Sequence, residues 1–240
     1  MSHIRKYYRI NRSWNHLIVG PGICAEKQVM ILTGDDKNSF INECERQSFN
    51  EFVNKTVKDE SRSYIDNFAC INQSNITIIN AVKISEALRG IDILDYRIDN
   101  TPFHVRGLDY IISEKFIKII EKYKLPDYNK IKLKIEGFNT NYYLIGFPVI
   151  IPEKFNYKKS IFYDHCLKKN RKFKNHEEYY NDNNYLDGTV DYFKVVLFDR
   201  YSFDVLHLPG SLFFSENLIV EIEKMNIIAL EINKKVTVEC

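Results

Sequence analysis

The residues best suited to chemistry meet at Asp164-His165-Cys166, with His176 ten positions further on. A cysteine beside a histidine suggests a nucleophile with its base. Such a pair works through contact in space, however, and adjacent side chains point in different directions. A zinc ion would need four ligands at closer spacing, so we expect neither a metal nor a cofactor. A small hydrolase or nuclease that uses His165, Cys166 or His207 is the alternative hypothesis for function.

The remaining candidates for a catalytic base lie in apolar runs. His207 falls within Val205-Leu206-His207-Leu208, and His104 lies between Phe103 and Val105. A histidine in such a run is more often a hydrogen-bonded core residue than a catalytic base. The chain has neither the glycine-rich motif of a phosphate-binding loop nor that of a dinucleotide site. It also lacks the hydrolase motif G-x-S-x-G and the zinc-protease motif H-E-x-x-H. We therefore expect that the protein is not an enzyme.

A dense basic run covers 168–174, and tyrosines and acidic residues follow it at once. Lysines interleaved with aromatic residues can hold single-stranded nucleic acid, but here the acidic residues cancel the charge. The whole chain has 34 Lys and Arg against 32 Asp and Glu. This balance gives no overall field that would attract nucleic acid or an anionic membrane. We interpret 168–188 as a polar surface insertion, and we do not expect nucleic acid as a partner.

Composition places the chain among well-packed proteins, with 45% hydrophobic residues in 240. Its five cysteines are odd in number, widely spaced and without a C-x-x-C pair, which favours reduced thiols in the cytoplasm. The N-terminal apolar run is short and broken by proline and glycine, so it makes a poor signal peptide. No segment reaches the ~20 apolar residues that a membrane helix needs. We expect a cytoplasmic protein with no membrane partner.

One ten-residue phrase occurs twice and predicts the elements that would position any site. Ser113 to Lys122 reads SEKFIKIIEK, and Ser215 to Lys224 reads SENLIVEIEK. Serine is a favoured N-cap, and the glutamate that follows it lies at the positive end of the helix dipole. Apolar residues then recur at the spacing of one buried helix face. Each copy follows an apolar run and precedes a strand-like stretch, so one unit is built twice.

These patterns predict an α+β fold with mostly antiparallel strands and three or four amphipathic helices. Two of the helices belong to the repeated serine-capped helix-strand unit. We expect 1–98 to form an N-terminal lobe of strands with one long helix, packed on the remainder. The region 99–240 then contains both repeats and the insertion 168–188.

From about residue 99 to residue 235, the chain resembles bacterial immunity proteins that are encoded beside polymorphic toxins. The paired Ile112-Ser113-Glu114 and Phe214-Ser215-Glu216 phrases carry the resemblance. Phe203 to Gly210 is similar to the family's Asp-hydrophobic-Arg-Leu-Pro element, with His207 where an arginine is more usual. Tyr142-Tyr143-Leu144-Ile145, between the repeats, also fits the family pattern.

The resemblance implies a protein without catalysis that binds a cognate toxin and blocks its active site or its access to substrate. A few aromatic and charged anchors would supply most of the affinity. The polar insertion offers such anchors on an exposed segment. The expected partner-binding residues are Glu177, Glu178, Tyr179, Tyr180, Asp182, Tyr185 and Asp187. The oligomeric state stays open.

Overall fold

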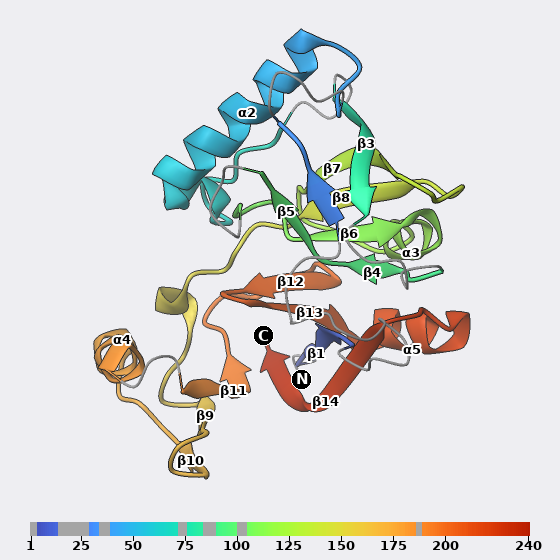
Figure 1. Ribbon diagram of the computed structural model, residues 1–240. Coiled ribbons are helices and arrows are strands. Elements are labelled where there is room, and N and C mark those ends of the chain that lie inside the picture. Colours follow the sequence, from blue (N-terminus) through green and yellow to red (C-terminus); the bar gives the residue numbers. More distant parts are fainter. Residues whose placement is uncertain are drawn as a thin grey trace.

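The computed structural model describes residues 4–13, 29–33, 39–71, 76–83, 90–99, 105–185 and 189–240 (Figure 1). The described part of the chain has an α+β fold, as the sequence predicts. Its α-helices are α2 (Glu43–Lys58), α3 (Glu114–Ile120), α4 (His176–Tyr185) and α5 (Glu216–Met225). Short 3-10 turns, η1 (Glu60–Ser63) and η3 (Pro152–Lys154), lie in the connections.

The strands form two seven-stranded sheets. The first sheet has the order β4 (Ile93–Leu94), β6 (Tyr110–Ser113), β8 (Tyr142–Gly146), β7 (Asn129–Ile135), β3 (Thr77–Lys83), β2 (Val29–Ile31), β5 (Tyr96–Ile98). The second has the order β10 (Lys169–Arg171), β9 (Ile161–Asp164), β11 (Val190–Val196), β14 (Leu230–Glu239), β1 (Lys6–Arg12), β13 (Ser211–Ser215), β12 (Val205–Leu208). Most neighbours are antiparallel, whereas β3 with β7, β11 with β14 and β2 with β5 are parallel.

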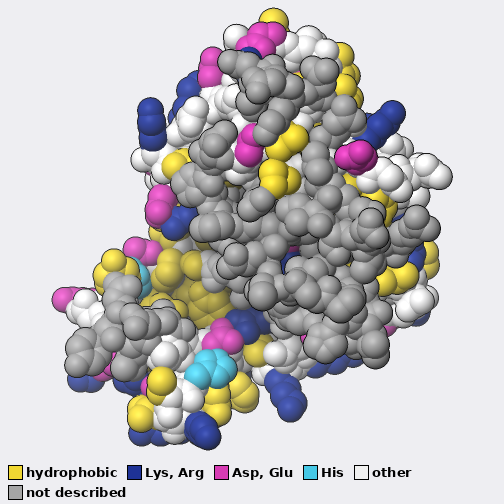
Figure 2. Space-filling view, viewed as in Figure 1, with side chains coloured by type: hydrophobic (Ala, Val, Ile, Leu, Met, Phe, Trp, Pro, Cys, Tyr) yellow, Lys and Arg dark blue, Asp and Glu magenta, His cyan; other side chains and the backbone are white. Residues whose placement is uncertain are grey.

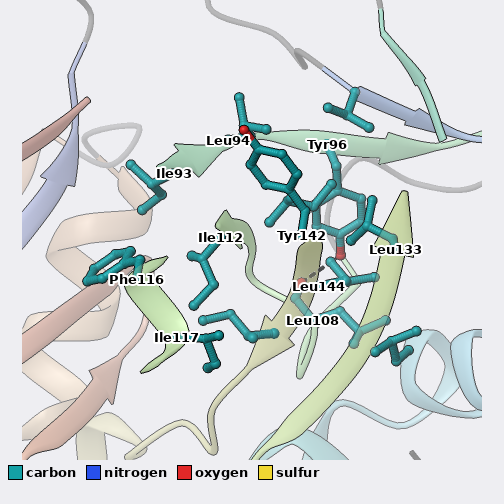
Figure 3. Packing of buried hydrophobic residues seen from close by; sticks show 14 of the residues in the cluster. Ile93, Leu94, Tyr96, Leu108, Ile112, Phe116, Ile117, Leu133, Tyr142 and Leu144 are labelled. Atoms are coloured by element: carbon teal, nitrogen blue, oxygen red, sulfur yellow. Dashed lines mark hydrogen bonds between the residues drawn. The ribbon is translucent and has the colours of Figure 1, made fainter. Parts of the chain in front are cut away.

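The first sheet curls until its edges meet, because β4 and β5 lie at opposite ends of the strand order yet only Asp95 separates them in the chain. The curled sheet encloses a core of aliphatic and aromatic side chains (Figure 3). Within it the Tyr96 hydroxyl donates to the carbonyl of Leu108 at 2.6 Å, which satisfies a polar group that water does not reach.

The repeated phrase forms the predicted helix starts. The Ser113 hydroxyl oxygen accepts the N–H of Phe116 at 3.1 Å, and the Ser215 hydroxyl oxygen accepts the N–H of Leu218 at 3.4 Å. Each serine ends a strand and caps the next helix, so strand and helix join without a loop. The apolar faces of α3 and α5 are buried in the same core, where the rings of Phe116 and Phe214 lie 6.3 Å apart.

The two sheets repeat one arrangement far beyond this phrase. The order β4-β6-β8-β7-β3-β2 matches β12-β13-β1-β14-β11-β9, and every neighbouring pair has the same relative direction in both. The helices correspond as well, with α3 before β7 as α5 is before β14, and α2 between β2 and β3 as α4 is between β9 and β11. Figure 1 shows α2 beside the first sheet and α4 beside the second.

The strand order bears on two predictions about the organisation of the chain. The boundary at residue 98 falls inside the first sheet, between β5 and β6, while β1 belongs to the second sheet. The described part of the polar insertion, 168–185, has regular structure and forms β10 and α4. His104, which was considered as a catalytic base, lies outside the described residues.

Candidate partner-binding surface

Two side-chain hydrogen bonds cap the start of helix α4. Asn175 accepts the N–H of Glu178 through Oδ1 at 2.9 Å, and the Glu178 carboxylate accepts the N–H of Lys174 at 2.6 Å. This reciprocal arrangement satisfies backbone donors that a helix start leaves free. Glu178, predicted as a partner anchor, therefore holds the helix start in place.

The inner face of α4 is anchored by one aromatic side chain. Tyr179 is buried, and its ring lies 4.8 Å from that of Phe162 and 5.4 Å from that of Phe173. Ring pairs at these distances add to the stabilisation from area burial. The prediction that Tyr179 is an exposed anchor is wrong, because this side chain belongs to the core of the second sheet.

An ion-pair network fixes α4 to the β9–β10 hairpin. Arg171 pairs with Asp182 on α4 and, at 3.2 Å, with Asp164 at the end of β9. The hydrogen bond from the Leu167 N–H lowers the pKa of Asp164 below its ordinary value, and Arg171 lowers it further. Asp182, another predicted anchor, is thus an internal partner of Arg171.

Of the predicted set, Glu177 and Tyr180 remain on the outer face of α4. Glu177 is exposed, and Tyr180 exposes 56% of its surface. The side chain of Tyr185 and the whole of Asp187 lie outside the described residues. The outer face of α4 therefore carries the Glu177 carboxylate and the Tyr180 ring, while the inner face of the helix packs against the core.

The surface continues from α4 to the η3 turn. His176 contacts the ring of Tyr180 at 5.9 Å and lies 3.6 Å from the carboxylate of Glu153. The next residue, Lys154, accepts the N–H of Phe198 through its carbonyl at 3.0 Å. Phe198 exposes 63% of its surface.

We call this surface the α4–η3 face, and it consists of Glu153, Lys154, His176, Glu177, Tyr180, Phe198 and Asp199. The face combines two exposed rings with charged side chains. On the side of the molecule seen in Figure 2, hydrophobic side chains gather in a hollow between the α4 region at lower left and the main body. Sequence analysis missed Phe198, because an apolar residue at the end of a strand pattern is usually expected inside.

The residues of the alternative hypothesis do not meet. His207 lies on β12, at one edge of the second sheet, and His165 and Cys166 follow β9 near the other edge. Five strand spacings separate β9 from β12, which is about 24 Å along the sheet. His207 is buried, with Nδ1 3.1 Å from the carbonyl oxygen of Phe147. His165 and Cys166 are exposed on the turn after β9.

Other places in the described residues offer little for chemistry. A hollow of about 440 Å³, open to solvent, is lined by Cys70 and by residues of the α3–β7 connection. Burial raises the pKa of the Cys70 thiol, which favours its protonated form. Within the described ranges, no three His, Cys, Asp or Glu residues are placed to hold a metal ion. The four described cysteines are all free.

Comparison with known proteins found no matching family model, curated protein or solved structure. Among the helices of the described residues, none combines the length and apolar character needed to cross a membrane.

Proposed function

We propose that this protein is an immunity protein that binds a cognate bacterial toxin and blocks the toxin's active site or access to it. The paired strand-Ser-Glu-helix phrases support the proposal through their resemblance to immunity proteins. We further propose that the α4–η3 face makes the contact. The protein performs no catalysis in this proposal, and its action depends only on binding.

The observation that carries this assignment is the exposure of two large rings, Tyr180 at 56% and Phe198 at 63%, on firmly held backbone. Exposed aromatic side chains are the residues most often responsible for binding energy at protein interfaces. Tyr179 fixes the helix beneath Tyr180, so little conformational freedom is lost when a partner binds. Glu153 and Glu177 give the face carboxylates that suit a partner with a basic rim.

The test is co-expression with the product of the neighbouring toxin gene, with cell survival and co-purification as readouts. We expect rescue of growth and a stable complex. Replacing both rings (Tyr180→Ala with Phe198→Ala) should weaken the complex by at least about 30-fold, since a lost hot spot costs about 2 kcal/mol or more.

Ile41→Ala is the matched control, because Ile41 is also exposed (60%) but lies beside the first sheet, next to α2. It should leave affinity unchanged. A neighbouring gene product that is neither toxic nor bound would contradict the immunity proposal. A complex that the double variant leaves intact would contradict the α4–η3 face alone.

A further inference from the structure

Strand β1 has the position in the second sheet that β8 has in the first, but the two strands come from different parts of the chain. In the first sheet, β8 lies between β6 and β7 and follows β7 across the turn at Gly137, where φ is +77°. In the second sheet, β1 lies between β13 and β14 but comes from the opposite end of the chain. In the second unit, β1 from the N-terminal part of the chain thus takes the place that β8 has in the first.

Sequence and register both support this equivalence. β8 contains Tyr142-Tyr143-Leu144-Ile145, and β1 contains Tyr7-Tyr8-Arg9-Ile10. Tyr142 lies opposite Ser113, and Tyr7 lies opposite Ser215, so the two strands have the same register against the helix-capping serines. The repeat therefore includes a tyrosine pair that lies outside the repeated ten-residue phrase.

The first tyrosine of each pair makes the same hydrogen bond. The Tyr142 hydroxyl donates to the carbonyl of Ile91 at 3.0 Å, and the Tyr7 hydroxyl donates to the carbonyl of Phe203 at 2.8 Å. Ile91 and Phe203 are themselves equivalent, since each precedes the aspartate at the start of β4 or β12. Both tyrosines are almost fully buried.

Charge distinguishes β1 from β8. The N-terminal segment carries three arginines, and each one meets an aspartate: Arg5 pairs with Asp204, Arg9 with Asp191 and Arg12 with Asp95. Arg9 binds the Asp191 carboxylate through both terminal nitrogens, one of them at 2.7 Å. β8 has no arginine. The position between β13 and β14, with aspartates nearby on β11, before β12 and before β5, thus suits an extended strand that is cationic as well as aromatic.

We propose that the position between β13 and β14 is a binding site for an extended cationic strand, with β1 as its resident ligand. Covalent connection through 14–28 is then unnecessary for β1 to bind. The ligand class is a peptide with the pattern Tyr-Tyr-Arg-Ile, which adds main-chain hydrogen bonds to both neighbours and places alternate side chains in the core. This inference is independent of any toxin.

The test begins with the full chain, folded, with a protease site placed within 14–28. After cleavage, we expect both fragments to elute together in gel filtration. The fragments are then separated in urea, and the large one is diluted into buffer with a labelled peptide of residues 4–13. We expect this peptide to bind and to restore the near-UV circular dichroism of the intact protein.

Peptides with Tyr7→Ala or with Arg9→Leu, which copies Leu144 of β8, should bind at least about tenfold more weakly. A scrambled peptide is the control. Equal binding of the scrambled peptide would overturn the proposal. So would release of the short fragment from a large fragment that keeps its spectrum and melting temperature.

A circular permutant keeps the proposal testable if the large fragment does not refold. The two ends already exchange hydrogen bonds, with Arg5 N–H to the Cys240 carbonyl at 3.1 Å and Cys240 N–H to the Arg5 carbonyl at 3.2 Å. Joining Cys240 to Ile4 by a short turn and opening the chain within 14–28 makes β14 and β1 a hairpin like β7 and β8. We expect the native spectrum and a melting temperature close to that of the parent, and an unfolded permutant would overturn the proposal.

Discussion

Asp92 and Asp204 occupy equivalent positions before β4 and β12, and each binds the segment that follows the helix of the other unit. The Asp92 carboxylate accepts the N–H of Ile228, beyond α5, at 2.8 Å. The Asp204 carboxylate accepts the N–H of Lys124, beyond α3, at 3.0 Å. Each aspartate also accepts the hydroxyl of its own unit's capping serine at 2.5 Å. The two units are therefore joined reciprocally by a pair of buried carboxylates.

Removing either carboxylate should strongly destabilise the fold. Asp92→Ala and Asp204→Ala each leave a backbone N–H and a serine hydroxyl without their acceptor, so we expect each to lower the free energy of unfolding by about 3 kcal/mol. Urea denaturation followed by circular dichroism measures this. The exposed Asp127→Ala should change it by less than about 0.5 kcal/mol. If Asp92→Ala and Asp204→Ala each changed the free energy of unfolding by less than about 0.5 kcal/mol, the reciprocal connection would be refuted.

Gly146 should not tolerate a side chain. A Cβ at this position would lie 2.0 Å from the carbonyl oxygen of Gly107 and 2.5 Å from the backbone nitrogen of Leu108. Backbone atoms cannot move aside as a flexible side chain can, so we expect Gly146→Ala to cost more than about 2 kcal/mol. Thermal unfolding would show the loss. Asn11→Ala, at the equivalent position of β1, is the control and should melt close to the parent protein.

The α4 region should lose stability in acid through Asp164. Its pKa is lowered in the folded protein, chiefly by the Leu167 N–H and then by Arg171. The unfolded pKa is about 3.9, so the contribution of the ionised carboxylate is fully present above that pH. It is lost as the pH falls through the lower folded pKa.

We therefore expect Asp164→Asn to be less stable than the parent at pH 6 and to show a smaller further loss between pH 5 and pH 2. Urea midpoints across this range measure both effects. Parallel curves for the two proteins would mean that Asp164 does not supply the acid sensitivity. Asp127→Asn, on the exposed surface, should follow the parent curve.

Substitution of His207 separates a structural role from a catalytic one. The ring is buried and lies 3.1 Å from the Phe147 carbonyl oxygen, so His207→Ala should cost about 1–2 kcal/mol of stability. We expect toxin affinity to stay unchanged, because β12 and β9 lie near opposite ends of the strand order in the second sheet. If the His207→Ala variant kept the stability of the parent protein but no longer protected cells from the toxin, a catalytic histidine would be favoured instead.

Local patterns in the sequence were enough to predict the serine-capped helices. Ser113 and Ser215 satisfy free N–H groups within the next three residues, and the apolar stripes of α3 and α5 follow at once. These interactions span only a few positions, so they can be recognised from residue order. The α+β class follows from the same local evidence.

Helix α4 was missed for an equally physical reason. His176 to Tyr185 is rich in asparagine and acidic residues, without a regular apolar stripe, and so resembles a loop. Its helix is stabilised by contacts distant in the chain, through Tyr179 to Phe162 and Asp182 to Arg171. Which of its side chains face outward was thus decided by tertiary packing.

The sequence by itself determined where α3 and α5 begin, because caps and apolar periodicity act over a few residues. Only the tertiary structure decided that Tyr7 of β1 pairs beside Ser215 as Tyr142 of β8 does beside Ser113. A strand pattern specifies which side chains alternate, but not which strand supplies the neighbouring hydrogen bonds. That choice is made when the strands of each sheet pair, and it places β1 in the unit that contains β13 and β14.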